Sequence, residues 1–168
     1  MSLTNGVRMR ESGWRWLPIA AIVVALDQTS KGWIETHYLL GEFTPLLSWF
    51  DITRLHNPGA AFSFLAGAGG WQRWFFTLLA LGVSAVLIVW LRGLHERRER
   101  TLVIALVCVL AGAVGNVIDR MQHGYVVDFI HLHWQGWYFP AFNIADMFIT
   151  TGAVLLLWDA FGEWRRSR

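Results

Sequence analysis

The chain alternates between long apolar stretches and short polar segments, and four of the apolar stretches are long. Residues 71–91, 101–118 and 144–161 form nearly continuous apolar runs. The first stretch, 14–34, is interrupted near its end by Asp27-Gln28-Thr29-Ser30-Lys31. Because about 20 helical residues cross the hydrocarbon core of a bilayer, the pattern predicts four membrane-spanning helices, at about 14–34, 71–91, 101–119 and 143–162.

The composition agrees with an integral membrane protein. Hydrophobic residues make up 55% of the chain, charged residues only 15%, and there are 11 Trp among 168 residues. Soluble domains carry about 25% charged residues, and Trp favours membrane–water interfaces. We therefore expect one membrane domain, 1–168, with outer loops at about 35–70 and 120–142.

Basic residues predict the orientation of the spans. Ten of the 14 Lys and Arg lie in three segments that four spans place on one side of the membrane. They are Arg8, Arg10 and Arg15 before the first span, Arg92, Arg97, Arg98 and Arg100 between the second and third, and Arg165, Arg166 and Arg168 after the fourth. The positive-inside rule then puts both termini in the cytoplasm. This explains the net charge of +2 without nucleic-acid binding.

A cleavable signal peptide is the alternative interpretation of the first stretch, since basic residues precede an apolar run. The sequence Ala25-Leu26-Asp27 is a poor cleavage site, and three more spans follow. We therefore favour a retained helix.

The two outer loops are more than linkers. Residues 50–56 alternate and contain β-branched side chains, which predicts a short extended segment. Asn57-Pro58-Gly59 marks a turn, and the apolar residues 60–65 are expected in or near the membrane interface. The second loop carries aromatic side chains suited to the headgroup zone, namely Trp134, Trp137, Tyr138 and Phe139.

The unusual polar residues of the spans all fall at the outer ends. They are Asp27, Lys31, Asn116, Asp119, Arg120, Asn143 and Asp146, and Asp128 lies in the second outer loop. A charged side chain at the bilayer centre costs about 2.5–3.5 kcal/mol on insertion scales. Such residues need an ion-pair partner, a water-filled cavity or a role in function. Because they lie at a common depth, they predict a functional site there.

Two of these groups have ordinary structural interpretations. Asp27 and Lys31 are four residues apart on a helix and can pair; we favour this ion pair over a direct chemical role. Asp119 and Arg120 can form a capping pair at a helix end. Arg120 can equally present its guanidinium to a substrate carbonyl or a carboxylate, and the sequence leaves these two alternatives open.

Asp128 and Asp146 carry the candidate chemistry. Taken singly, Asp146 is a helix cap and Asp128 a surface acid, but a short aromatic loop returns from one to the other at the same membrane face. Two adjacent carboxylates hold a proton between them. The ionised member can take a proton from water while the protonated member polarises a carbonyl. This is the chemistry of aspartic proteases, and it requires no metal or cofactor.

Other chemistries fit less well. His131 and His133 lack the companion ligands of a common zinc pattern. Ser63 and Ser84 lack the surroundings of a serine nucleophile. Cys108 lies deep in an apolar run, which does not suggest a reactive thiolate.

Five motifs in order make the chain resemble the bacterial lipoprotein signal peptidases (signal peptidase II) from about residue 14 to 162. They are Asp27-Gln28-Thr29-Ser30-Lys31, Asn57-Pro58-Gly59-Ala60-Ala61-Phe62-Ser63, Gly115-Asn116-Val117-Ile118-Asp119-Arg120, Val126-Val127-Asp128-Phe129 and Phe142-Asn143-Ile144-Ala145-Asp146. The resemblance implies an all-α integral membrane protein with four transmembrane helices, and a small β-platform and a mobile flap on the periplasmic side of the bacterial inner membrane.

The resemblance also implies a function and roles for residues. The expected activity is an aspartic endopeptidase that removes the signal peptide of a prolipoprotein just before a diacylglyceryl-modified cysteine. Asp128 and Asp146 correspond to the catalytic pair. Other matching residues would line the substrate site or hold the pair, namely Asn57, Gly59, Asn116, Arg120 and Asn143, with Asp27, Lys31 and Asp119 as structural polar residues. We expect a monomer whose partners are this substrate and membrane lipids.

One position departs from the family pattern. Met147 stands where the family usually has a small hydroxyl residue after the second catalytic acid, which bears on local tuning of the pair.

Two other functions are weighed against the peptidase. A small proton-coupled transporter also needs intramembrane acids, and a lipoprotein-binding factor would retain the site without turnover.

Overall fold

The computed structural model describes residues 11–59 and 70–168. The interfacial segment predicted at 60–65, the flap beyond Pro58, and Arg8 and Arg10 lie outside the described residues. The helices are a short 3-10 turn, Gly13–Trp16, then α1 (Leu17–His37), α2 (Trp71–Gly93), α3 (Arg100–Gln122) and α4 (Ile144–Arg166). The strands are β1 (Phe43–Leu47), β2 (Phe50–Asn57), β3 (Val126–Trp134) and β4 (Trp137–Tyr138). Each predicted span contains one long helix.

Helix α3 is the centre of the helical bundle and packs against α4, α2 and α1. It is buried along most of its length, whereas the other long helices expose one side. The apolar core joins Leu87 and Leu91 of α2 to Val103, Leu106 and Leu110 of α3. Small residues in the second half of α3 let the neighbouring helices approach it closely.

The outward sides of the helices are apolar. Ile22 of α1, Val89 of α2 and Leu157 of α4 are 60%, 71% and 72% exposed. Within the described residues, α2, α3 and α4 are long and apolar enough to cross a membrane. Such exposure is unfavourable in water and favourable in lipid, so the chain is a multi-pass membrane protein.

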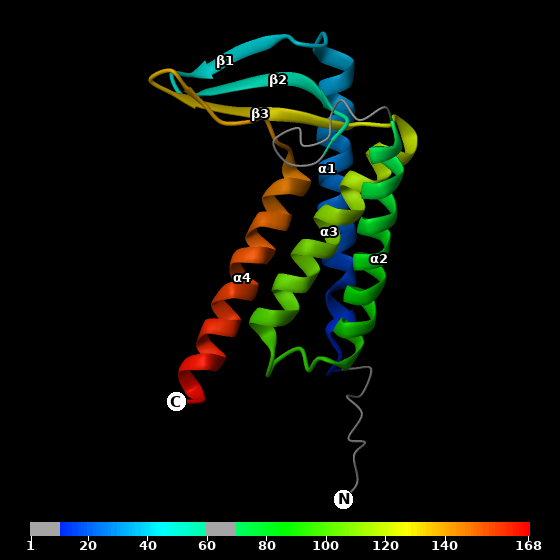
Figure 1. Cartoon of the computed structure of the whole chain (residues 1–168), viewed down its shortest axis with the longest axis vertical. Coiled ribbons are helices and arrows are strands. Elements are labelled where there is room, and N and C mark those ends of the chain that lie inside the picture. The colour runs from blue at the N-terminus through cyan, green and yellow to red at the C-terminus, as the bar shows by residue number, and fades with distance from the viewer. Residues whose placement is uncertain (1–10, 60–69) are drawn as a thin grey trace, which may run out of the picture.

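A small antiparallel sheet lies across one end of the bundle (Figure 1). Its strand order is β1-β2-β3-β4. Strand β2 is the extended segment predicted at 50–56, whereas the sequence pattern did not reveal β3 and β4. Gln135 and Gly136, with φ of 48° and 86°, form the tight turn between β3 and β4. The loop between α3 and α4 is therefore a hairpin that carries Asp128 on its first strand.

The close contact between α3 and α4 makes a testable prediction at Gly112. A Cβ atom added there would meet the backbone carbonyl oxygen of Ala145, in the first turn of α4. We expect Gly112→Ala to lower the stability by roughly 1–3 kcal/mol, and to lower the activity because the first turn of α4 moves. Gly82→Ala is the control, because a Cβ at Gly82 meets nothing within 4 Å. Thermal unfolding in detergent measures both, and equal melting temperatures for the two variants would contradict the prediction.

Candidate active site

Asp128 and Asp146 reach the site from two different kinds of element. Asp128 is in β3 and only 3% exposed. Antiparallel pairing with β2 places it opposite Leu55 and brings Asn57 opposite Val126. Asp146 is in the first turn of α4, held there by a capping box in which it exchanges hydrogen bonds with Asn143.

Three amide side chains hold the two carboxylates. Asn143 Nδ2 donates to Asp128 Oδ1 at 2.7 Å, and Asn57 Nδ2 donates to Asp128 Oδ2 at 3.0 Å. Asn116 Nδ2 donates to Asp146 Oδ1 at 2.8 Å, and the backbone N–H of Asn143 donates to Asp146 Oδ2 at 3.3 Å. Each of the four carboxylate oxygens therefore accepts one of these bonds, and a carboxylate oxygen has a second lone pair for another partner.

Asn143 connects the two acids directly. Its side-chain nitrogen binds Asp128, while its side-chain oxygen accepts the backbone N–H of Asp146 at 2.9 Å. The residue is fully buried, with no exposed surface. One side chain therefore caps α4 and fixes the position of β3 relative to that helix.

Electrostatics favour a proton on the pair at neutral pH. Burial, and after it the negative charge of Asp146, raise the pKa of Asp128 to about 7. The hydrogen bonds from Asn57 and Asn143 and the charge of Lys31 oppose this shift. At neutral pH the pair can therefore offer both a proton donor and a proton acceptor, as general acid–base catalysis requires.

The predicted ion pair between Asp27 and Lys31 is present, with Nζ 2.8 Å from Asp27 Oδ2. Lys31 also pairs with Asp119 at 3.0 Å and donates to Asn116 Oδ1 at 3.1 Å. Nothing in the sequence pattern indicated that one lysine would join α1 to two positions of α3. This buried cluster lies directly behind the amide that binds Asp146.

Among the described residues, the capping pair considered for Asp119 and Arg120 does not describe their contacts, whereas binding of a substrate carbonyl or carboxylate by Arg120 stays a prediction. Asp119 binds Lys31, and the described residues show no ion pair between Asp119 and Arg120. Arg120 Nη2 donates to the carbonyl oxygen of Gly59 at 3.0 Å, and Nη1 donates to the carbonyl oxygen of Asn116 at 3.3 Å. Arg120 therefore ties α3 to the end of the β2 segment that carries Asn57.

Two polar groupings were missed by the sequence analysis. Gln28 Nε2 donates to Asp119 Oδ1 at 2.7 Å, next to the Lys31 cluster. Only the place of Gln28 in the first motif pointed to it.

The second group lies on the sheet, where Asp51 binds His131 and His133 at 3.3 and 3.1 Å. Although burial by itself raises the pKa of Asp51, these hydrogen bonds outweigh it and lower that pKa below its usual value. In the parts of the chain that the structure describes, no group of three or more His, Cys, Asp or Glu side chains is arranged to hold a metal ion.

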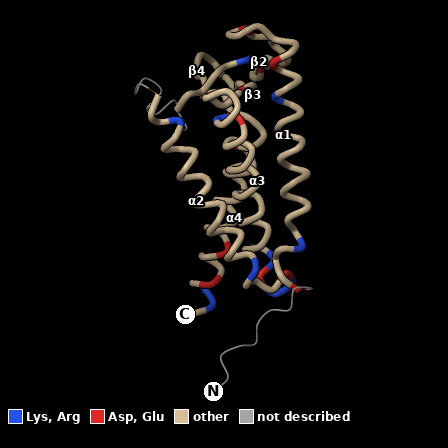
Figure 2. Tube along the Cα trace, turned by 90° about the vertical axis from the view of Figure 1, so that its right-hand side faces the viewer, with Lys and Arg blue, Asp and Glu red and all other residues tan. Residues whose placement is uncertain are grey.

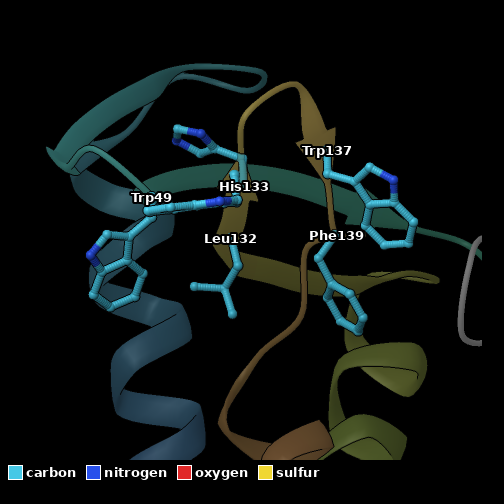
Figure 3. Close-up of a pocket in the computed structure, with 6 residues that line it drawn as sticks. Trp49, Leu132, His133, Trp137 and Phe139 are labelled. Carbon is cyan, nitrogen blue, oxygen red and sulfur yellow. The ribbon is translucent and has the colours of Figure 1, made fainter.

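An aromatic cavity of about 460 Å³ lies at the outer end of the sheet (Figure 3). It is lined by Trp49, Leu132, His133, Trp134, Trp137 and Phe139. Leu132 and Asp128 point to the same face of β3, because alternate residues of a strand share a face. The cavity contains neither acid, so it is separate from the acid pair.

A buried acid pair at one end of a helical bundle with apolar outward sides indicates a membrane enzyme as the class of protein. The comparisons with known proteins are specific. Residues 19–162 match the family model described as signal peptidase (SPase) II. A lipoprotein signal peptidase of Shewanella woodyi is 50% identical over 151 residues, which cover 90% of this chain and 85% of that protein. One from Shewanella oneidensis is 48% identical over 152 residues, covering 90% and 89%.

Two solved structures of bacterial membrane enzymes share the fold. One has a TM-score of 0.80 and 31% identity, and the match covers 89% of each chain. The other has a TM-score of 0.70 and 34% identity, and the match covers 83% of this chain and 87% of that one. The chain belongs to the signal peptidase II family.

Proposed function

We propose that this protein is an aspartic endopeptidase that removes the signal peptide from prolipoproteins, cutting just before a diacylglyceryl-modified cysteine. Membership of the family supports the peptidase activity and the class of substrate, and gives no support to a transporter. The arrangement of Asp128 and Asp146 supports the aspartic mechanism. It is the single observation that carries the proposal, because both acids are held by amide donors while Asp128 has a pKa of about 7.

In this mechanism the pair holds one proton and activates water. The ionised carboxylate takes a proton from a water molecule, whose oxygen attacks the scissile carbonyl carbon. The protonated carboxyl donates its proton to the carbonyl oxygen, giving a neutral tetrahedral intermediate. When the C–N bond breaks, the carboxyl that gained the water proton passes it to the leaving amine, and the other acid regains its proton from the intermediate. The pair ends with the single proton it started with.

The remaining site residues have supporting roles in this proposal. Asn57, Asn116 and Asn143 orient the carboxylates through the hydrogen bonds described above. Arg120 binds the carbonyl oxygen of Gly59 and so holds the end of the segment that carries Asn57. Met147 is 49% exposed, and nothing in the structure assigns it a part in the chemistry.

We further propose that all four long helices span the bacterial inner membrane within a single domain. Helix α1 has 21 residues, and its intramembrane charges Asp27 and Lys31 are paired. Basic residues gather at the end of the bundle opposite the sheet (Figure 2). The positive-inside rule supports cytoplasmic termini and a periplasmic sheet. The acid pair then lies near the outer leaflet, at the depth of a lipid-modified cysteine, and a monomer contains the whole site.

Cleavage by purified protein tests the proposal. We expect a diacylglyceryl-modified prolipoprotein to be cut before its modified cysteine, and the same precursor without the lipid to be cut far more slowly. Activity is expected to fall as the pH rises above about 7, because Asp128 then loses its proton. Binding of the lipid-modified precursor without product would instead indicate a binding factor.

A further inference from the structure

Lys31 lies at the centre of a buried cluster that joins α1 to α3. A lysine ammonium has three N–H donors, and the three acceptors around this one are Asp27 Oδ2, Asp119 Oδ2 and Asn116 Oδ1. The side chains of Lys31, Asp27 and Asp119 are at most 3% exposed. All three ammonium donors are therefore used inside the protein.

The two carboxylates of this cluster also bind backbone N–H groups. Asp27 Oδ1 accepts the N–H of Ala145, the residue immediately before one acid of the catalytic pair, at 2.9 Å. Asp119 Oδ2 accepts the N–H of Val127, the residue immediately before the other acid, at 3.1 Å. One ammonium is thus linked, through one carboxylate on each side, to the backbone that precedes each acid.

We propose that Lys31, Asp27 and Asp119 are positioning residues that set the separation and orientation of the two catalytic carboxylates. This inference rests on the proposed function and deepens it. Strand β3 and helix α4 enter the site independently, and the cluster fixes both to a common point. The cluster also contacts the carboxylate of Asp146 through Asn116, which accepts a hydrogen bond from Lys31 and donates one to Asp146.

The alternative role for the cluster is neutralisation of charge within the membrane. A buried ion pair is weak grounds for inferring stability, because desolvation offsets the attraction between the charges. Neutralisation alone also needs no contact with the residues before the two acids. Misplacement of a reacting group by about 1 Å can cost a factor of about 100 in rate, so a fixed reference point for both acids has a direct catalytic effect.

Matched pairs of variants separate the two roles. Asp27→Asn and Asp119→Asn keep an oxygen that can accept the backbone N–H, whereas Asp27→Leu and Asp119→Leu remove it at similar volume. We expect each Leu variant to lower kcat by about 100-fold, with KM within about threefold of wild type. Each Asn variant is expected to retain at least about tenfold more activity than its Leu counterpart. Melting temperature and kcat are measured on the same folded, purified protein.

The pH profile gives a second readout, which reports the effect of the Lys31 charge on Asp128. Asp128 is faced by the charges of Asp146 on α4, Lys31 on α1 and Arg120 on α3, and by the amides of Asn57 and Asn143. Because the charge of Lys31 lowers the pKa of Asp128, Lys31→Gln is expected to move the upper pH limit of kcat to higher pH.

The control is Glu35→Gln, one turn further along α1. Glu35 lies 3.6 Å from Arg54 in an ion pair at the membrane-surface end of the helix, so this variant should keep both kcat and the pH limit.

If the Asn and Leu variants of Asp27 and Asp119 lose activity equally, or if the loss is in KM alone, the proposal is wrong. Should Lys31→Gln not fold, the Asn and Leu pairs decide the question. Retained activity of Asp128→Asn would overturn the catalytic pair itself, which is a different outcome from failure of these variants.

Discussion

Asp128→Asn and Asp146→Asn are each expected to lower the rate of prolipoprotein cleavage by at least about a thousandfold, because each removes one partner of the proton transfer. An amide has nearly the same shape as a carboxyl group, so both variants should still bind the substrate. The measurement is product formation by purified protein at saturating substrate. Asp159→Asn is the matched control, because it replaces an acid on the same helix α4, far from the site.

Retained turnover in either single variant would show that the pair is not catalytic. Loss of substrate binding together with turnover would show that the acid in question shapes the binding site instead. Only loss of the rate with preserved binding agrees with the mechanism.

Asp128→Asn should also change how stability depends on pH. The pKa of Asp128 is about 7 in the folded protein against 3.8 ordinarily, so the folded state keeps a proton that the unfolded state releases. The contribution of Asp128 to the free energy of unfolding is therefore largest below about pH 4. It is lost as the pH rises to about 7, and amounts to roughly 4 kcal/mol at most. The variant lacks this group, so its melting temperature should fall less over that interval.

Asn143→Ala is the second change with a large expected effect. It removes the 2.7 Å donor to Asp128 and the 2.9 Å acceptor that caps α4. We expect about a hundredfold loss of activity, because the two acids lose their direct connection. We also expect a loss of about 1–3 kcal/mol of stability, because a cap and a buried hydrogen bond disappear together.

Asn143→Ser separates the two contributions. Serine caps a helix about as well as asparagine, but its shorter side chain does not replace the amide donor to Asp128. The serine variant should melt at a temperature between those of the alanine variant and the wild type, and remain as inactive as the alanine variant. Full activity in the serine variant would contradict the role of the Asn143 amide.

The sequence predicted the long helices and the candidate acids because both depend on local patterns. Apolar runs mark membrane helices, and isolated polar residues at one depth stand out against them. Two motifs contained Asp128 and Asp146, and the second of them also contained Asn143. The extended segment at 50–56 was also visible, because its alternation is local.

The rest depended on contacts between distant parts of the chain. The spacing of Asp27 and Lys31 predicted a helical pair, but the link from Lys31 to Asp119 depends on how α1 and α3 pack. The binding of Val127 and Ala145 by carboxylates uses backbone groups, which leave no mark on side-chain patterns. Strand β3 was missed although apolar and polar residues alternate from Ile130 to Trp134.

The polar network of the site stops at the sheet end of the bundle. Towards the other end, α2 and α3 meet through buried aliphatic side chains, among them Leu87, Leu91, Val103 and Leu106. Groups that exchange protons with water are a hazard in a membrane that stores energy as a proton gradient. Among the described residues, these four side chains form an aliphatic layer that has no hydrogen-bonding groups of its own. In the proposed inner-membrane setting, such a layer helps to confine water and protons to the face that holds the acids.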